Sequence, residues 1–226
     1  MPSQTMRCYY LLGITGVGKS TLLAGLSDSG LAVRAVTEWP DPMPEEIAWS
    51  PDAFDARQQE RIQDWIFTQV AKKNRQLAEL VSGSIAVEFE GGVSRAVIVD
   101  RSPLDTFAFY PRELWPLRAR QTLGYLQPGE RFVAGELLLL KGDPTAVCAR
   151  MHRDRHYDVE TLAAQQRRFL DVAHELGSRR GNDAGIHIIN AAVDRAAVLE
   201  HVASLLTTDS YHPVDIHACI TTIAAP

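Results

Sequence analysis

Gly13-Ile14-Thr15-Gly16-Val17-Gly18-Lys19-Ser20 is the stretch that decides the fold, because it fits the phosphate-binding pattern G-x-x-x-x-G-K-[ST] at every fixed position. The apolar run 8–12 predicts a buried strand before this loop, and 21–26 predicts the first turns of a helix after it. In that setting, glycines let backbone N–H groups approach phosphate oxygens at the positive end of the helix. The stretch therefore predicts that the chain binds a nucleoside triphosphate.

Two side chains of the loop have chemistry to offer. We expect Lys19 to reach the β- and γ-phosphates of ATP and to act in catalysis, and the Ser20 hydroxyl to ligate Mg²⁺. Thr21 completes the expected ATP-binding stretch. A chance match in a glycine-containing turn is the alternative, and the agreement of strand and helix context disfavours it.

Composition bounds the class of protein. The 226 residues are 46% hydrophobic and 23% charged, which suits one compact α/β domain over 1–207 followed by a C-terminal tail, 208–226, that either packs on the domain or stays mobile. A net charge of −5 disfavours a nucleic acid polymer as partner. Three cysteines without CxxC spacing predict a reducing compartment. No signal peptide and no run of about 18 apolar residues is visible, so we expect a cytoplasmic protein with no membrane contact.

Alternating strands and helices predict the architecture. Helical spacing of apolar residues appears over 51–80, 159–176 and 195–206. Four further apolar runs predict strands at 32–37, 96–99, 136–140 and 186–189. This order predicts a P-loop NTPase fold, with a five-stranded parallel sheet and helices on both faces. In such sheets ligands gather at the carboxyl ends of the strands.

The predicted strand 96–99 runs directly into Asp100-Arg101-Ser102. We expect Asp100 to belong to the Mg²⁺ shell and Arg101 to hold a phosphate oxygen or the acceptor oxygen. Ser102 before Pro103 is also a good helix N-cap, and both interpretations can hold at once.

The predicted strand 32–37 ends at Glu38, which precedes Trp39 and Pro40. A kinase needs a group that orients the acceptor hydroxyl and takes its proton. Glu38 is the best candidate and Asp100 is its rival. A solvated turn residue is the alternative for Glu38.

An arginine-rich segment, 150–158, predicts a lid over the phosphates. We expect Arg150 to contact ATP, and Arg153 and Arg155 to stabilise the transferring group in catalysis. Because Asp154 and Asp158 alternate with the arginines, a solvated helix face is the alternative.

Together these motifs resemble the deoxynucleoside kinases and their relatives, the thymidylate kinases. In the former the corresponding patterns are Glu-Pro, [Glu/Asp]-Arg-Ser and Arg-x-x-Arg-x-Arg-x-x-Glu, and the resemblance runs from about residue 7 to 190. It implies that Glu38 is the base toward a nucleoside 5′-hydroxyl, with Arg101 beside that hydroxyl. It also implies that a glutamine of the long helix reads the base edge, with Gln69 as the closest match and Gln63 as the second.

The remaining acceptor contacts are less specific. Arg75, six residues after Gln69, is expected to reach toward the acceptor, and Trp39 to lie beside it. Both are expectations from position in the resembling motifs. A surface position on the helix is the alternative for Gln69.

Departures from the family pattern bear on the acceptor. Trp39 interrupts the usual Glu-Pro pair, 41–46 is acidic and proline-rich, and Thr37 stands where thymidylate kinases typically place an arginine. These features favour a nucleoside or nucleoside-like alcohol over a nucleoside monophosphate. The sequence therefore predicts an ATP- and Mg²⁺-dependent small-molecule kinase.

Several alternatives stay open. They are a thymidylate-like monophosphate kinase, a kinase of a non-nucleoside metabolite or antibiotic, and a regulatory P-loop NTPase. The resembling families commonly form dimers through long helices, so the helix 51–80 is a candidate homodimer surface. Core packing would explain the same apolar pattern.

Overall fold

The computed structural model describes residues 6–36, 39–45, 56–82, 96–151 and 157–225, and only the backbone of 56–59. Its centre is a five-stranded sheet in the order β2-β3-β1-β4-β5, in which every pair of neighbours is parallel. The strands are β1 (Arg7–Leu12), β2 (Val33–Val36), β3 (Ala96–Asp100), β4 (Glu136–Lys141) and β5 (Ile186–Asn190). The five predicted strands and their parallel arrangement are confirmed.

The register of the central strands positions the site. β1, β3 and β4 are buried over nearly their whole length, as near-continuous apolar strands in a parallel sheet must be. Leu11 pairs with Asp100 across β1 and β3, and Leu12 pairs with Leu139 across β1 and β4. The segments that follow β1 and β3 therefore leave the same edge of the sheet side by side.

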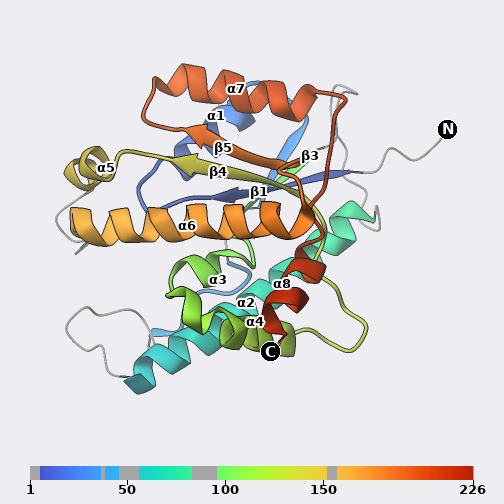
Figure 1. Cartoon of the computed structure of the whole chain (residues 1–226). Coiled ribbons are helices and arrows are strands. Elements are labelled where there is room, and N and C mark those ends of the chain that lie inside the picture. The colour runs from blue at the N-terminus through green and yellow to red at the C-terminus, as the bar shows by residue number, and fades with distance from the viewer. Residues whose placement is uncertain (1–5, 37–38, 46–55, 83–95, 152–156, 226) are drawn as a thin grey trace.

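Helices cover both faces of the sheet, as predicted. Figure 1 shows α1 and α7 on one face and α6, with α3 and α2 beyond it, on the other. The helices are α1 (Lys19–Asp28), α2 (Ala56–Val81), α3 (Asp105–Ala108), the 3₁₀ turn η3 (Arg112–Leu114), α4 (Trp115–Gly124), α5 (Pro144–Arg150), α6 (Val159–Arg180), α7 (Arg195–Thr207) and α8 (Ile216–Ala224). Among the described helices, none is both long enough and apolar enough to cross a membrane.

Aspartates fix the starts of the later helices. Asp143 caps α5 by accepting from the Thr145 N–H, and Asp158 caps α6 by accepting from the Thr161 N–H. The same role falls to Asp194 and Asp215 at the starts of α7 and α8. A carboxylate at an N-cap satisfies a backbone donor that the helix leaves free. Asp158, at the end of the predicted lid 150–158, is therefore the N-cap of α6. Residues 152–156 of that lid lie outside the described residues.

The C-terminal segment packs on the sheet and on α4. The Tyr211 hydroxyl bonds the Cys8 backbone at both the N–H (2.9 Å) and the carbonyl (3.2 Å). Val214 forms an antiparallel bridge with Gly135. α8 buries four apolar side chains at helical spacing, which are Ile216, Cys219, Ile220 and Ile223. Of the two behaviours left open for this segment, the structure therefore has the packed one.

Candidate functional site

Glycines give the loop between β1 and α1 its shape. Gly13 has φ 139° and Gly18 has φ 111°, both in the region that side-chain-bearing residues avoid. A Cβ on Gly13 would lie 2.7 Å from the Leu140 carbonyl oxygen of β4, so this position also lacks room for one. Gly18 is the N-cap of α1 and brings no capping side chain, which leaves the first N–H groups of that helix available to an anion.

The Lys19 side chain folds over this loop and is hydrogen-bonded to it. Its side chain is buried, and Nζ donates to the carbonyls of Gly13 (2.9 Å) and Ile14 (3.1 Å). Burial, and then the nearby Arg101 charge, lower the pKa of Lys19. Ser20 and Thr21 are exposed at the start of α1. The ammonium is thus held among backbone acceptors that a phosphate group could replace.

Asp100 ends β3 next to the loop. Its Oδ1 is buried and has no hydrogen-bond partner among the described residues. A buried carboxylate oxygen without a partner is costly unless a cation or donor meets it. It therefore fits an Mg²⁺ ion, which is usually held by one or two protein groups plus water and phosphate. The described residues contain no group of three or more metal-binding side chains, and an ion bound through a nucleotide needs none.

Arg101 is held in a strained backbone conformation. Its φ is 71°, the only positive value at a non-glycine position in the described part of the chain. Such strain persists where the surroundings determine it, and it clusters at functional sites. Here a capping box follows: the Ser102 Oγ accepts from the Leu104 N–H (3.1 Å), and the Asp105 Oδ2 accepts from the Ser102 N–H (2.8 Å). Ser102 therefore caps the turn that leads into α3, whereas the helix itself begins two residues later than predicted, at Asp105, with Leu104 as its N-cap.

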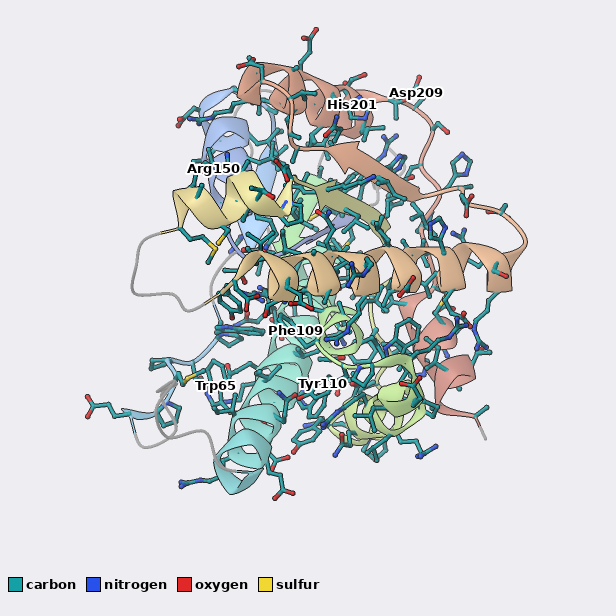
Figure 2. All side chains as sticks on the ribbon, turned by 60° about the vertical axis from the view of Figure 1, so that its left-hand side comes forward. Trp65, Phe109, Tyr110, Arg150, His201 and Asp209 are labelled. Carbon is teal, nitrogen blue, oxygen red and sulfur yellow. The ribbon has the colours of Figure 1, made fainter. Side chains whose placement is uncertain are left out.

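A cavity of about 420 Å³ opens beside these groups. Five of its fifteen lining residues are aromatic, and Figure 2 shows three of them, Trp65, Phe109 and Tyr110, in one region near α2. Trp39 packs edge-on against Trp65 with ring centroids 5.6 Å apart. The lining residues are Thr15, Trp39, Met43, Ile62, Gln63, Trp65, Ile66, Val70, Arg101, Ser102, Asp105, Thr106, Phe109, Tyr110 and Tyr157.

Only some of the predicted acceptor residues line this cavity. Trp39, Arg101 and the second-choice Gln63 do. Gln69 is buried and bonded to Asp41, away from the lining. Arg75 donates from Nε to Glu130 at 2.8 Å and does not line it either.

The remaining predicted residues are Glu38, the expected base toward the acceptor, and the arginines of the predicted lid. Arg150 ends α5 as an exposed side chain whose Nε donates to the Ala146 carbonyl, and Figure 2 shows it on that helix. Glu38, Arg153 and Arg155 lie outside the described residues, so their roles stay predictions.

Among known proteins, a solved structure resembles this chain in fold, although the sequence comparisons find no match. No family model matches the sequence, and no curated protein matches it significantly. A solved thymidylate kinase from Candida albicans, described as having broad substrate specificity, matches with a TM-score of 0.62 and 15% identity, over 93% of this chain and 98% of that one. The chain has the P-loop NTPase fold of that kinase. The likeness to deoxynucleoside kinases stays a prediction from the motifs.

Sequence reasoning missed several cavity residues. Asp105 could have been found, because it lies three residues after Ser102 in the capping-box spacing. Phe109, Tyr110 and Tyr157 had no such signal, since they come from turns that flank short or irregular segments. Their place in the site depends on how α3 and α6 pack together.

Asp105 makes stability depend on pH. Burial raises its pKa from 3.8 to about 6, against the opposing effect of Arg101 and Lys19. Because the folded pKa is the higher one, the folded state binds more protons between these values, and the free energy of unfolding falls as pH rises through them. Asn at this position can still accept from the Ser102 N–H. We expect Asp105→Asn to be more stable than wild type at pH 7, by about 1–3 kcal/mol.

Urea unfolding of both proteins at pH 4 and pH 7 measures this difference. The gain at pH 7 should disappear at pH 4, where the wild-type carboxyl is largely neutral. Other titrating groups cancel because both proteins contain them. A variant that is less stable than wild type at pH 7 would show instead that the neighbouring cations stabilise the ionised carboxylate.

Proposed function

We propose that the protein is an ATP-dependent kinase that transfers the γ-phosphoryl group to a hydroxyl of a nucleoside or nucleoside-like acceptor. One observation carries the proposal: Thr15 of the phosphate loop and Arg101 line the same cavity, together with five aromatic side chains. A triphosphate on the loop would therefore present its terminal phosphate to whatever occupies that cavity. Proximity of this kind is the main requirement of phosphoryl transfer.

Charge neutralisation would fall to groups at the sheet edge. Lys19 and the start of α1 would hold the phosphates, and Ser20 and Asp100 would hold Mg²⁺, which neutralises phosphate charge when bound. Arg101 would stabilise charge on the transferring group or the acceptor oxygen. Glu38 would orient the acceptor hydroxyl and take its proton, and Arg150, Arg153 and Arg155 would close over the phosphates, as the motifs predict.

The cavity supports a flat, largely uncharged acceptor. Its aromatic walls suit stacking with a planar ring, which contributes about 1 kcal/mol per ring contact. Arg101 is the only lysine or arginine among its described lining residues. A phosphate monoester brings a charge of about −2 and is usually gripped by clustered cations. A neutral hydroxyl therefore fits these walls better than a monophosphate does.

A monophosphate kinase is the second candidate. It is favoured by the likeness in fold to a thymidylate kinase. The arginines of the predicted lid would supply the cations that the described lining lacks. A homodimer through α2 also stays a prediction, although Trp65, its most prominent aromatic, lines the cavity.

A coupled ADP-release screen tests the function. Purified protein with Mg²⁺ and ATP, and in parallel GTP, is offered nucleosides, the matching 5′-monophosphates and nucleoside-like natural products. We expect ATP-dependent turnover with at least one nucleoside or nucleoside-like alcohol, and slower turnover with its monophosphate. Glu38→Gln should lower that turnover by about 10²-fold or more while a fluorescent ATP analogue still binds.

Each other outcome is decisive. Faster turnover of monophosphates would establish the second candidate. ATP hydrolysis that no small acceptor stimulates, but that a protein partner does, would replace both with a regulatory NTPase. Full turnover in Glu38→Gln would remove that residue from the mechanism.

A further inference from the structure

Two buried amide side chains on α2 each hold a different loop. Gln69 accepts at Oε1 from the Asp41 N–H and donates from Nε2 to the Asp41 carboxylate, both at 2.9 Å. Asn74 donates to the Arg131 carbonyl at 2.9 Å and accepts from the Val133 N–H at 3.0 Å. Both side chains are almost fully buried, with exposures of 1% and 4%. The two amide side chains are alike in chemistry and burial, and differ in the segment to which they are hydrogen-bonded.

The segment held by Gln69 forms part of the acceptor cavity. Trp39 and Met43, on either side of Asp41, both line that cavity. A second tie to α2 lies nearby, because the Lys73 ammonium is 5.5 Å from the centre of the Trp39 ring and donates to the Asp100 carbonyl. The stretch 39–45 is therefore fastened to α2, which itself contributes Ile62, Trp65 and Ile66 to the cavity wall.

We propose that Gln69 is a positioning residue, which holds 39–45 against α2 and thereby gives the acceptor cavity its shape. The proposal rests on the proposed function for its link to the acceptor, while the hold itself stands on geometry alone. It replaces the expectation that Gln69 reads the acceptor directly. Both ends of its amide are engaged with Asp41, and its side chain does not line the cavity.

Differences in burial indicate which side chain contributes most to holding 39–45 against α2. Lys72 also pairs with Asp41, but both side chains are more than two-fifths exposed, at 42% and 45%. Exposed ion pairs contribute little, because water screens them. The buried amide of Gln69, in contrast, would be left without partners if the segment moved away. Gln69 should therefore dominate the hold, with the Asp41 carboxylate second and Lys72 a minor contributor.

The kinetic test uses Gln69→Leu, Asp41→Ala and the double variant, with Asn74→Leu as the matched control. The substrate is whichever acceptor the ADP-release screen identifies. We expect Gln69→Leu to raise the KM for the acceptor about tenfold and to leave the KM for ATP within about twofold. Asp41→Ala should raise the acceptor KM less, because the backbone N–H of residue 41 can still donate to Gln69. The double variant should resemble Gln69→Leu, since both changes break one contact.

The control separates position from stability. Asn74→Leu removes an equally buried pair of hydrogen bonds from the same helix, so it should lose about as much stability in urea as Gln69→Leu does. Its acceptor KM should stay at the wild-type value. An equal rise in KM for Asn74→Leu would mean that general loosening of α2 is the cause, and would overturn the proposal.

A second readout needs no acceptor and no activity. Acrylamide quenching of tryptophan fluorescence should rise in Gln69→Leu, because Trp39 leaves its contact with Trp65. The increase should vanish when Trp39→Phe is added, and it should be absent from Asn74→Leu. If quenching rises as expected but no acceptor is turned over, the hold is real and the proposed function fails.

Two results would overturn the hold itself. One is unchanged quenching in Gln69→Leu. The other is a change of acceptor preference in Gln69→Leu that Asp41→Ala does not share, which would show that Gln69 contacts the acceptor directly.

Discussion

Replacing Lys19 by methionine should lower kcat for phosphoryl transfer by about 10³-fold or more. Its ammonium is held by the Gly13 and Ile14 carbonyls beside the α1 start, so it is already in the loop that would receive the phosphates. Methionine fills similar space without the charge. Because the ammonium is desolvated, its removal should not destabilise the fold.

Single-turnover kinetics with radiolabelled ATP measures this loss, and urea unfolding measures the stability. Lys19→Arg is the informative companion, because it keeps the charge but not the size at a buried position. We expect it to be nearly as inactive as Lys19→Met. Activity within about tenfold of wild type in Lys19→Met would mean that the loop does not hold the transferring phosphate.

Arg101→Gly should gain stability and lose activity together. Arg101 has φ 71°, and glycine adopts that conformation without strain. Relief of the strain should raise the free energy of unfolding by about 1 kcal/mol. Loss of its guanidinium, whose charge acts on Lys19 and Asp105, should lower kcat by about 10³-fold, as loss of a phosphate-stabilising arginine does elsewhere.

Arg101→Ala is the matched control, because it removes the same guanidinium but keeps a Cβ. The two variants should be equally inactive, and alanine should be the less stable by about 1 kcal/mol in urea. Equal stability would show that the backbone at this position stores no strain. Retained turnover in both would remove Arg101 from the proposed mechanism.

Local patterns predicted the elements of the fold well. The strands were predicted because buried parallel strands are apolar throughout. At α3 only a helix start was predicted, two residues too early, and neither its short length nor the turn that follows was, since four helical residues carry no periodicity. α8 was missed although its apolar spacing is helical, because no other feature marked it.

The roles of Gln63 and Gln69 show where sequence reasoning ends. Both lie on α2, six residues apart, and motif resemblance favoured Gln69 as the acceptor contact. The structure turns Gln63 into the cavity and buries Gln69 against Asp41. Which side of a helix faces a ligand depends on the rotation of that helix against the sheet, and no local pattern specifies it.

The loop 13–20 was determined by the sequence itself, because its glycines, Lys19 and Ser20 all belong to one strand–loop–helix unit. The neighbouring position of Asp100 needed only the rule that parallel strands end at one edge. The cavity was decided by tertiary structure alone. Its walls come from chain segments as distant as Thr15 and Tyr157, and only packing of the helices on the sheet brings them together. The means of binding a triphosphate is thus local, and the choice of acceptor is not.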